Sequence, residues 1–242
     1  MGIISAIPTL WKDKVKGTFS EAININDRNS RPHIYVTVQD KRVSLHKIRT
    51  RGFYNLGLEI CIPTALKRWE YEGLAPQKWS DILYLPYTCT RSTKLQSFQF
   101  QVIHRYVPTK KFLYLRRLVD TPNCPNCGMV DTLIHHFFLC HMVRSFWENV
   151  FAYINRHYEE RLQPTLHNVL FDLLNVPHVF NLLIIIGKQY VHTCYLRERS
   201  VVFQVFLSQV SEMHKTERKV ATNCSKRMEA FSHKWRMFKE LE

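Results

Sequence analysis

The segment Cys124-Pro125-Asn126-Cys127-Gly128, followed by His135 and Cys140, decides what is expected of this chain. A Cys-x2-Cys pair on a tight turn presents two sulfurs to one point, which suits a tetrahedral ion. Pro125 fixes φ inside the turn, and Gly128 can adopt a positive φ just after the second cysteine. With a histidine and a third cysteine downstream, the spacing predicts a closed, structural Cys3His zinc site.

The histidine ligand stays open on spacing alone, because His135 and His136 are neighbours. On a regular α-helix, His136 shares a face with Cys140 better than His135 does. His141 is a weaker candidate because it lies too close to Cys140. A redox function for the Cys-x2-Cys pair would require a helix to begin at Cys124, whereas the preceding residues have the composition of a loop.

The other cysteines and several histidines are expected to be structural. They have no partner at metal spacing, so the thiols are predicted to be buried: Cys61, Cys89, Cys194 and Cys224. Three histidines lie within apolar helical patterns and are predicted to be core residues: His104, His178 and His192.

Upstream of the cysteines, no acidic residue occurs between Asp81 and Asp120, although the segment is rich in lysine and arginine. A solvated helix face normally mixes the two signs of charge, so this bias favours contact with phosphates over a plain basic surface. The predicted nucleic-acid contacts are Lys94, Arg105, Lys110, Lys111, Arg116 and Arg117. Tyr106 or Tyr114 could stack on unpaired bases.

Composition favours a folded, mostly helical, basic protein. The chain has 242 residues, 45% of them hydrophobic, only 7 glycines and a net charge of +14. Helical periodicity dominates, and one β-hairpin is predicted from Ile34–Val38 and Val43–Leu45. The expected fold is therefore mostly α, a helical bundle around a zinc knuckle with a small hairpin near the N-terminus. The predicted regions are 1–90 (hairpin and short helices), 91–160 (basic helices and knuckle) and 161–242 (helical region with a basic tail).

The sequence also suggests a cellular setting. Seven cysteines without a signal peptide favour a reducing compartment, cytoplasmic or nuclear, over secretion. The most apolar run, Leu182 to Gly187, is too short to span a bilayer, and no membrane partner is expected. The positive charge predicts an acidic partner, with nucleic acid first.

Taken in order, the central residues resemble the zinc-binding segment near the C-terminus of non-LTR (LINE-type) retrotransposon polyproteins: Cys124 to Gly128, Asp131 to His135, Phe137-Phe138, Cys140 and Phe146-Trp147. Further segments resemble the fish members of this family: Tyr84 to Tyr87, Leu95 to Gln99, Gly187-Lys188, and Val191-His192 with Cys194. The resemblance covers about residues 80–240 and implies that His135 is the histidine ligand.

The resemblance implies a nucleic-acid-binding module, with RNA favoured, that accompanies a reverse transcriptase core. The chain lacks the paired aspartates of a polymerase and the carboxylate and histidine set of an endonuclease, so neither activity is carried over. No enzymatic activity is expected. The alternative is a zinc-stabilised protein-interaction module that docks on a polymerase core.

Overall fold

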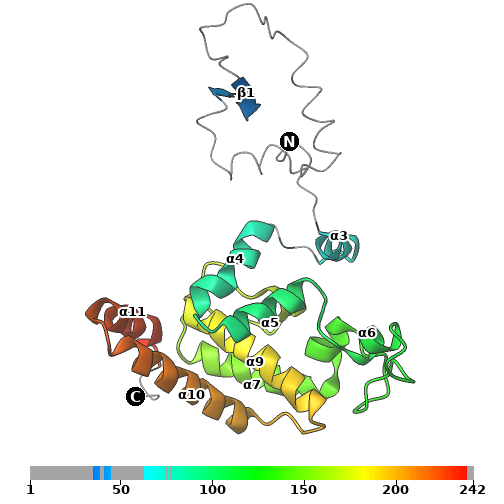
Figure 1. Ribbon diagram of the computed structural model, residues 1–242. Coiled ribbons are helices and arrows are strands. Elements are labelled where there is room, and N and C mark those ends of the chain that lie inside the picture. The colour runs from blue at the N-terminus through cyan, green and yellow to red at the C-terminus, as the bar shows by residue number, and fades with distance from the viewer. Residues whose placement is uncertain (1–34, 39–40, 45–62, 75, 77, 239–242) are drawn as a thin grey trace, which may run out of the picture. The chain divides into compact units, whose positions relative to one another are not determined.

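The computed structural model describes strands 35–38 and 41–44 and residues 63–74, 76 and 78–238 (Figure 1). The chain divides into two units, residues 1–62 and 63–242. The predicted boundaries after residues 90 and 160 differ from this division, because both lie within the second unit. The helix that the sequence suggests from about Lys47 lies outside the described residues.

In the first unit, strands β1 (Tyr35–Val38) and β2 (Lys41–Ser44) form an antiparallel hairpin. Tyr35 pairs with Ser44 and Val38 with Lys41. The second strand therefore begins earlier than predicted, since Lys41 and Arg42 belong to the strand and not to the turn. This pair is the only sheet in the part of the chain that the structure describes.

The second unit is helical. Its elements in chain order are α3 (Thr64–Tyr71), α4 (Trp79–Cys89), α5 (Thr93–Ile103), α6 (Lys110–Tyr114), the π-helix η3 (His135–Leu139), α7 (His141–Asn155), α8 (Leu166–Phe171), α9 (His178–Leu196), α10 (Phe203–Ala221) and α11 (Ser225–Trp235). Short polar caps begin two of them: the hydroxyl of Thr109 accepts from the N–H of Phe112, and that of Thr165 from Asn168. The mostly helical class predicted from the sequence is confirmed.

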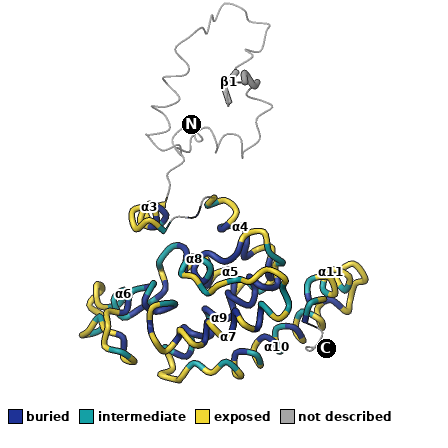
Figure 2. Tube along the Cα trace, turned by 180° about the vertical axis from the view of Figure 1, so that it is seen from behind, coloured by how far each residue is buried: buried dark blue, intermediate teal, exposed yellow. Residues whose placement is uncertain are grey.

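Helix α9 is the centre of this unit. It is apolar nearly all round, as the sequence indicates, and α4, α5, α7, α10 and α11 all contact it. The buried residues follow α7, α8 and α9, whereas the outer turns of α6, α10 and α11 are exposed (Figure 2). Among the described helices, none combines the length and the apolar character needed to cross a bilayer.

One buried ion pair lies inside this core. The ammonium of Lys188 on α9 is 2.7 Å from a carboxylate oxygen of Asp172, and both side chains are fully enclosed. Lys188 also donates to the carbonyl oxygen of Leu170, which links α9 to the end of α8. Burial raises the pKa of Asp172 to about 6, although the lysine opposes this shift. The pair ties two elements together at a site where a lone charge would be costly.

Candidate metal centre

The four predicted metal ligands meet at one point. The ligand atoms of Cys124, Cys127, His135 and Cys140 all lie within 4.8 Å of one another. Nε2 of His135 is 3.2 Å from Sγ of Cys127, and Sγ of Cys140 is 4.0 Å from each of the other two sulfurs. Three sulfurs and one imidazole nitrogen at such distances can hold one metal ion.

The first two cysteines sit on a turn that is closed by backbone hydrogen bonds. The N–H of Gly128 donates to the carbonyl of Cys124 at 2.9 Å, and the N–H of Cys124 donates to Met129 at 2.7 Å. Asn123 and Val130 pair across the base of this turn. Gly128 has φ +73°, the left-handed conformation that glycine adopts without strain. The turn thereby points both sulfurs to the same side.

A π-helical turn determines which histidine joins the cluster. Between His135 and Leu139 the backbone widens to a π-helix, and the N–H of Cys140 donates to the carbonyl of His135 at 2.9 Å. In this register residues five apart lie above one another, so His135 and Cys140 face the same point. On a regular α-helix His136 would have taken that place, which is why spacing alone left the choice open.

His136 instead belongs to a buried network behind the cluster. Its Nδ1 lies 3.3 Å from a carboxylate oxygen of Asp131, and its Nε2 lies 3.1 Å from Nδ1 of His192 on α9. Burial lowers the pKa of His192 to about 4, and the nearby His136 adds to the effect. The two rings therefore link the turn that carries His135 to the central helix.

Asp131 is the hub of this network. One of its carboxylate oxygens accepts from the backbone N–H of Lys110 and from the hydroxyl of Tyr195, each at 2.7 Å. Its carbonyl accepts from the N–H of Lys111 at 3.2 Å. Burial would raise the pKa of Asp131, but hydrogen bonds from His136, Lys110 and Tyr195 outweigh burial and hold the pKa below its usual value. Helix α6 is thus fixed to the cysteine turn.

Burial controls the protonation of the candidate ligands. Burial raises the pKa of Cys124, and it raises that of Cys140 to about 12, so without metal these thiols keep their protons. Burial also lowers the pKa of His135, which leaves its imidazole neutral. A bound divalent ion would displace the thiol protons and use the neutral imidazole directly.

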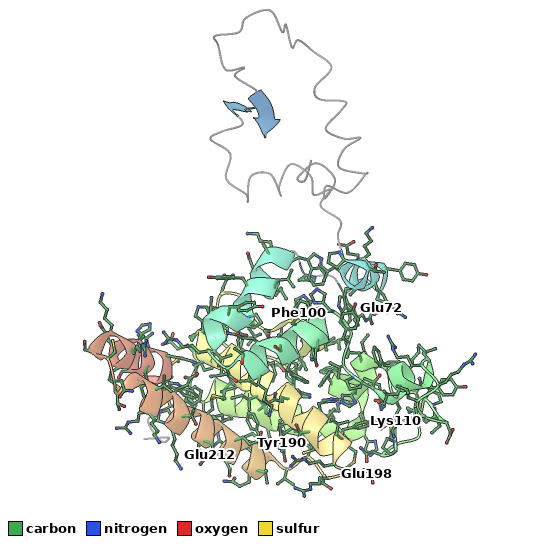
Figure 3. The ribbon with its side chains drawn as sticks, viewed as in Figure 1. Glu72, Phe100, Lys110, Tyr190, Glu198 and Glu212 are labelled. Atoms are coloured by element: carbon green, nitrogen blue, oxygen red, sulfur yellow. The ribbon has the colours of Figure 1, made fainter. Side chains whose placement is uncertain are left out.

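The predicted nucleic-acid contacts lie on several elements. Lys94 is an exposed residue of α5, Lys110 and Lys111 begin α6, and Arg116 and Arg117 follow α6 in exposed positions. The guanidinium of Arg116 lies 3.5 Å from the ring centre of Phe112, and one of its terminal nitrogens donates to the carbonyl of Phe112 at 3.1 Å. Apart from Lys94, these residues lie within or directly after α6, where Figure 3 labels Lys110, and the N–H groups of Lys110 and Lys111 bond to Asp131 near the four candidate ligands.

Arg105 differs from the other predicted contacts. Its guanidinium donates to both carboxylate oxygens of Glu72, at 2.9 and 2.7 Å, and lies 3.9 Å from the ring centre of Trp69. The side chain therefore joins α3 to the end of α5 and is committed within the protein. Spacing within the acid-free segment does not predict this pairing, because Glu72 lies before that segment.

Two predictions about structural side chains were wrong. Cys224 is exposed at the start of α11, and His178 is exposed at the start of α9, because both fall at helix ends and not on the buried faces. Cys89, Cys194 and His192 are buried as predicted, and His104 stacks on Phe100 in a partly exposed position. Cys61 lies outside the described residues.

Sequence reasoning missed two residues of this centre. Asp131 and Tyr195 complete the network behind the cluster, yet they are far apart in sequence and follow no motif spacing. In the sequence, Asp131 stands out only as the first residue of Asp131 to His135, a run that resembles the retrotransposon segment. Comparison with known proteins adds nothing to this picture, since no protein-family model, curated protein or solved structure matches the chain. The retrotransposon resemblance stays a prediction.

Proposed function

We propose that the cluster holds a structural Zn²⁺ ion. Zinc bound tetrahedrally at about 2.3 Å by sulfur would separate ligand sulfurs by about 3.8 Å, close to the 4.0 Å found between Cys140 and each other cysteine. Three thiolates and one imidazole are soft ligands that favour zinc over magnesium or calcium. Four protein ligands leave no open position for water, which suits a structural role.

We further propose that the surface around α6 binds nucleic acid, with single-stranded or structured RNA favoured. The observation that carries this proposal is the attachment of α6 to the cysteine turn through Asp131, which holds Lys110 and Lys111 beside the cluster. A metal at the cluster would fix these lysines in place. Backbone phosphates are the natural partners of such a basic surface.

Exposed aromatic rings accompany these charges. Tyr106 lies before α6 and is 59% exposed, and Tyr114 lies within α6 and is 45% exposed. A tyrosine ring is usually more deeply buried than this. Rings that stand in solvent beside lysine and arginine can stack on unpaired bases, which is how single-stranded nucleic acids are held without a fixed sequence. This combination favours RNA with unpaired segments over duplex DNA.

The resemblance places such a module beside a reverse transcriptase of the LINE type, in the cytoplasm or nucleus. On this proposal the chain supplies binding and no catalysis, because two-metal phosphoryl transfer needs clustered carboxylates and the acids of this sequence are scattered. Its partners would be RNA and a polymerase core.

RNA affinity measured across salt concentrations tests this function. The double variant Lys110→Glu/Lys111→Glu should weaken binding at least about tenfold and flatten the plot of log affinity against log salt by about 1.4, the value for two lost phosphate contacts on a single strand. A matched control is Lys67→Glu/Arg68→Glu on the exposed face of α3, which changes the net charge equally. If both pairs weaken binding alike, only the net charge matters and the proposed interface is wrong.

A protein interface is the second candidate, and one observation favours it. Four aliphatic side chains close to α6 and the cysteine turn are between 44% and 68% exposed: Leu115, Leu118, Met129 and Val130. Aliphatic groups contribute little to phosphate binding but much to protein interfaces. If Leu115→Ser/Leu118→Ser abolishes binding to a purified polymerase core after nuclease treatment, while RNA binding is undetectable, this second function replaces the first.

A further inference from the structure

A second site lies away from the metal centre. A cavity of about 900 Å³ opens between the C-terminal end of α4, the start of α9, and helices α10 and α11. Helices α11 and α6 lie on opposite sides of the helical unit (Figure 1), so this cavity is separate from the proposed RNA surface. Its size lies within the range of small-molecule binding sites, about 300–1,000 Å³.

The floor of the cavity is apolar. Side chains from three helices and the segment before α9 contribute to it, the main ones being Val176, Val179, Met213, Phe231 and Met237. Val179 is part of the core, so this floor is fixed by packing, and Met213 and Phe231 are only partly buried. A ligand body that is aliphatic or aromatic would gain contact and lose water here.

The rim of the cavity is cationic. Arg91, Arg227 and Arg236 border it and are exposed, and within residues 78–238 none of the three forms an ion pair. Glu217 is the one acidic residue among the described residues of the lining. Its carboxylate is already bound by Lys234, at 2.8 and 2.9 Å, and by the indole N–H of Trp235. The unneutralised charge of the rim is therefore positive.

Two of these arginines come from segments that are distant in sequence, and both line this cavity. Arg91 follows α4 and Arg227 lies in the first turn of α11, next to the exposed thiol of Cys224. The pKa of Cys224 is lowered, first by the backbone N–H of Arg227 and also by the charges of Arg227 and Arg91. Because both guanidinium groups border one cavity, they offer two positive charges to an anionic group that enters it.

We propose that this cavity binds a small amphipathic anion, with a carboxylate or monophosphate head between Arg91 and Arg227 and an apolar body against Val179, Phe231 and Met237. Guanidinium groups bind both kinds of head in a bidentate manner, so the shared chemistry is an oxyanion on a hydrophobic chain or ring. Occupation would join α4, α9, α10 and α11 and raise the melting temperature of the protein.

Calorimetric titration of the full, metal-loaded chain tests this site. The probes are decanoate and decyl phosphate, with decanol as the neutral control of the same chain length and inorganic phosphate as the head alone. We expect both amphipathic anions to bind one site at least tenfold more tightly than decanol or phosphate. Comparison of decanoate with decyl phosphate shows which head is preferred.

Three variants locate the binding. Arg227→Gln should weaken both anions about tenfold, whereas Lys226→Gln, its exposed neighbour outside the cavity on the same helix, should leave the affinity unchanged. Ala230→Trp places a bulky ring in the cavity from an exposed helix position and should abolish binding without disturbing the core. Circular dichroism checks that each variant is folded.

Several results would overturn the proposal. No binding of either anion, equal affinity for decanol, or equal affinity for inorganic phosphate would each show that the cavity does not recognise an amphipathic anion. An affinity that Arg227→Gln and Ala230→Trp leave intact would place the binding elsewhere. Since none of these measurements involves RNA, their outcome is independent of the function proposed for the α6 surface.

Discussion

At the scale of single residues, His135 and His136 have different roles although they are adjacent. The π-helical turn directs His135 to the sulfur of Cys127 and turns His136 to Asp131 and His192. One ring can bind a metal, and the other connects the turn to α9. Neutral imidazole can serve both purposes, so the backbone register alone separates them.

These roles predict different losses for the two histidines. His135→Ala should remove bound zinc from the purified protein, because three cysteines without the imidazole hold the ion more weakly. His136→Ala should keep one zinc per chain yet lower the free energy of unfolding by about 1–3 kcal/mol, since Asp131 and His192 lose a buried partner. Metal analysis and urea unfolding measure both quantities. Retention of zinc in His135→Ala together with its loss in His136→Ala would reverse the assignment.

The buried ion pair of Asp172 and Lys188 is a second case in which single residues affect the free energy of unfolding. Lys188→Met leaves a buried carboxyl without its cation, and we expect a loss of about 3–5 kcal/mol at neutral pH. Asp172→Asn/Lys188→Met removes both charges, so the double variant should recover most of this loss. If the double variant is as unstable as Lys188→Met, the loss comes from packing and not from the unpaired charge.

The pH dependence of this pair follows from the raised pKa of Asp172. Its carboxyl titrates near 3.8 when unfolded and at about 6 when folded, so its contribution to stability is complete below about 3.8 and is lost as the pH rises through 6. In Lys188→Met the folded pKa should rise further, and the deficit relative to wild type should be smaller at pH 5 than at pH 8. Urea unfolding at both pH values measures this difference, and an equal deficit would exclude the charge mechanism.

At the scale of elements, helix α7 connects η3, which carries His135, to the apolar core. The indole N–H of Trp147 donates to the carbonyl of Phe137 within η3 at 2.6 Å. On its other side, the ring of Trp147 packs against Gly187 of α9, where an added Cβ would lie 3.0 Å from two ring carbons. Glycine at this helical position therefore allows α9 and α7 to approach closely, and Trp147 links α9 to the π-helix.

Gly187→Ala tests this close approach. Alanine favours a helix by about 1 kcal/mol over glycine, but overpacking against a fully buried indole costs about 1–3 kcal/mol, so we expect a net loss of stability. In a Trp147→Phe background the two ring carbons are absent, and the same change should become neutral or stabilising. A double-mutant cycle by urea unfolding gives the coupling free energy. A coupling near zero would show that the contact is not tight.

At the scale of the whole molecule, we expect the proposed metal and the apolar core to stabilise different parts of the helical unit. Helix α9 packs mainly against α4, α5, α7, α10 and α11, which carry none of the four candidate ligands, and it also contacts η3. The segment from α6 to Cys140 contributes few core residues, chiefly Cys124, Leu133 and Phe137, and its thiols converge on the proposed zinc. Loss of metal is thus expected to loosen one region and spare the other.

Chelation measured by hydrogen exchange tests this division. Removal of zinc should lower the protection of amides in residues 110–140 strongly, because binding energy at such a site is folding energy. Protection in residues 178–196 should change little. Cys127→Ser should reproduce the pattern without chelator. If exchange rises equally throughout the helical unit, the metal stabilises the whole core and this division is wrong.

The sequence by itself determined the helical class and the three cysteines of the candidate site, and it left the histidine between His135 and His136. The prolines at 108, 164 and 177 all fall between helices, and α3 begins directly after Pro63, as expected of a residue that interrupts helices but tolerates their first turn. The Cys-x2-Cys turn is local, so its residue types fix its geometry without help from the rest of the chain. The same local rules predicted that α9 would be buried.

Only the tertiary structure decided which side chains serve each site. The π-register of η3 selects His135, Glu72 engages Arg105, and Arg91 and Arg227 line the same cavity. Each of these outcomes depends on residues that are distant in sequence or on a backbone register that propensity does not encode. Hydrophobic periodicity identifies the apolar face of a helix, but it does not identify the element against which that face packs. The candidate sites of this protein depend on such contacts between elements.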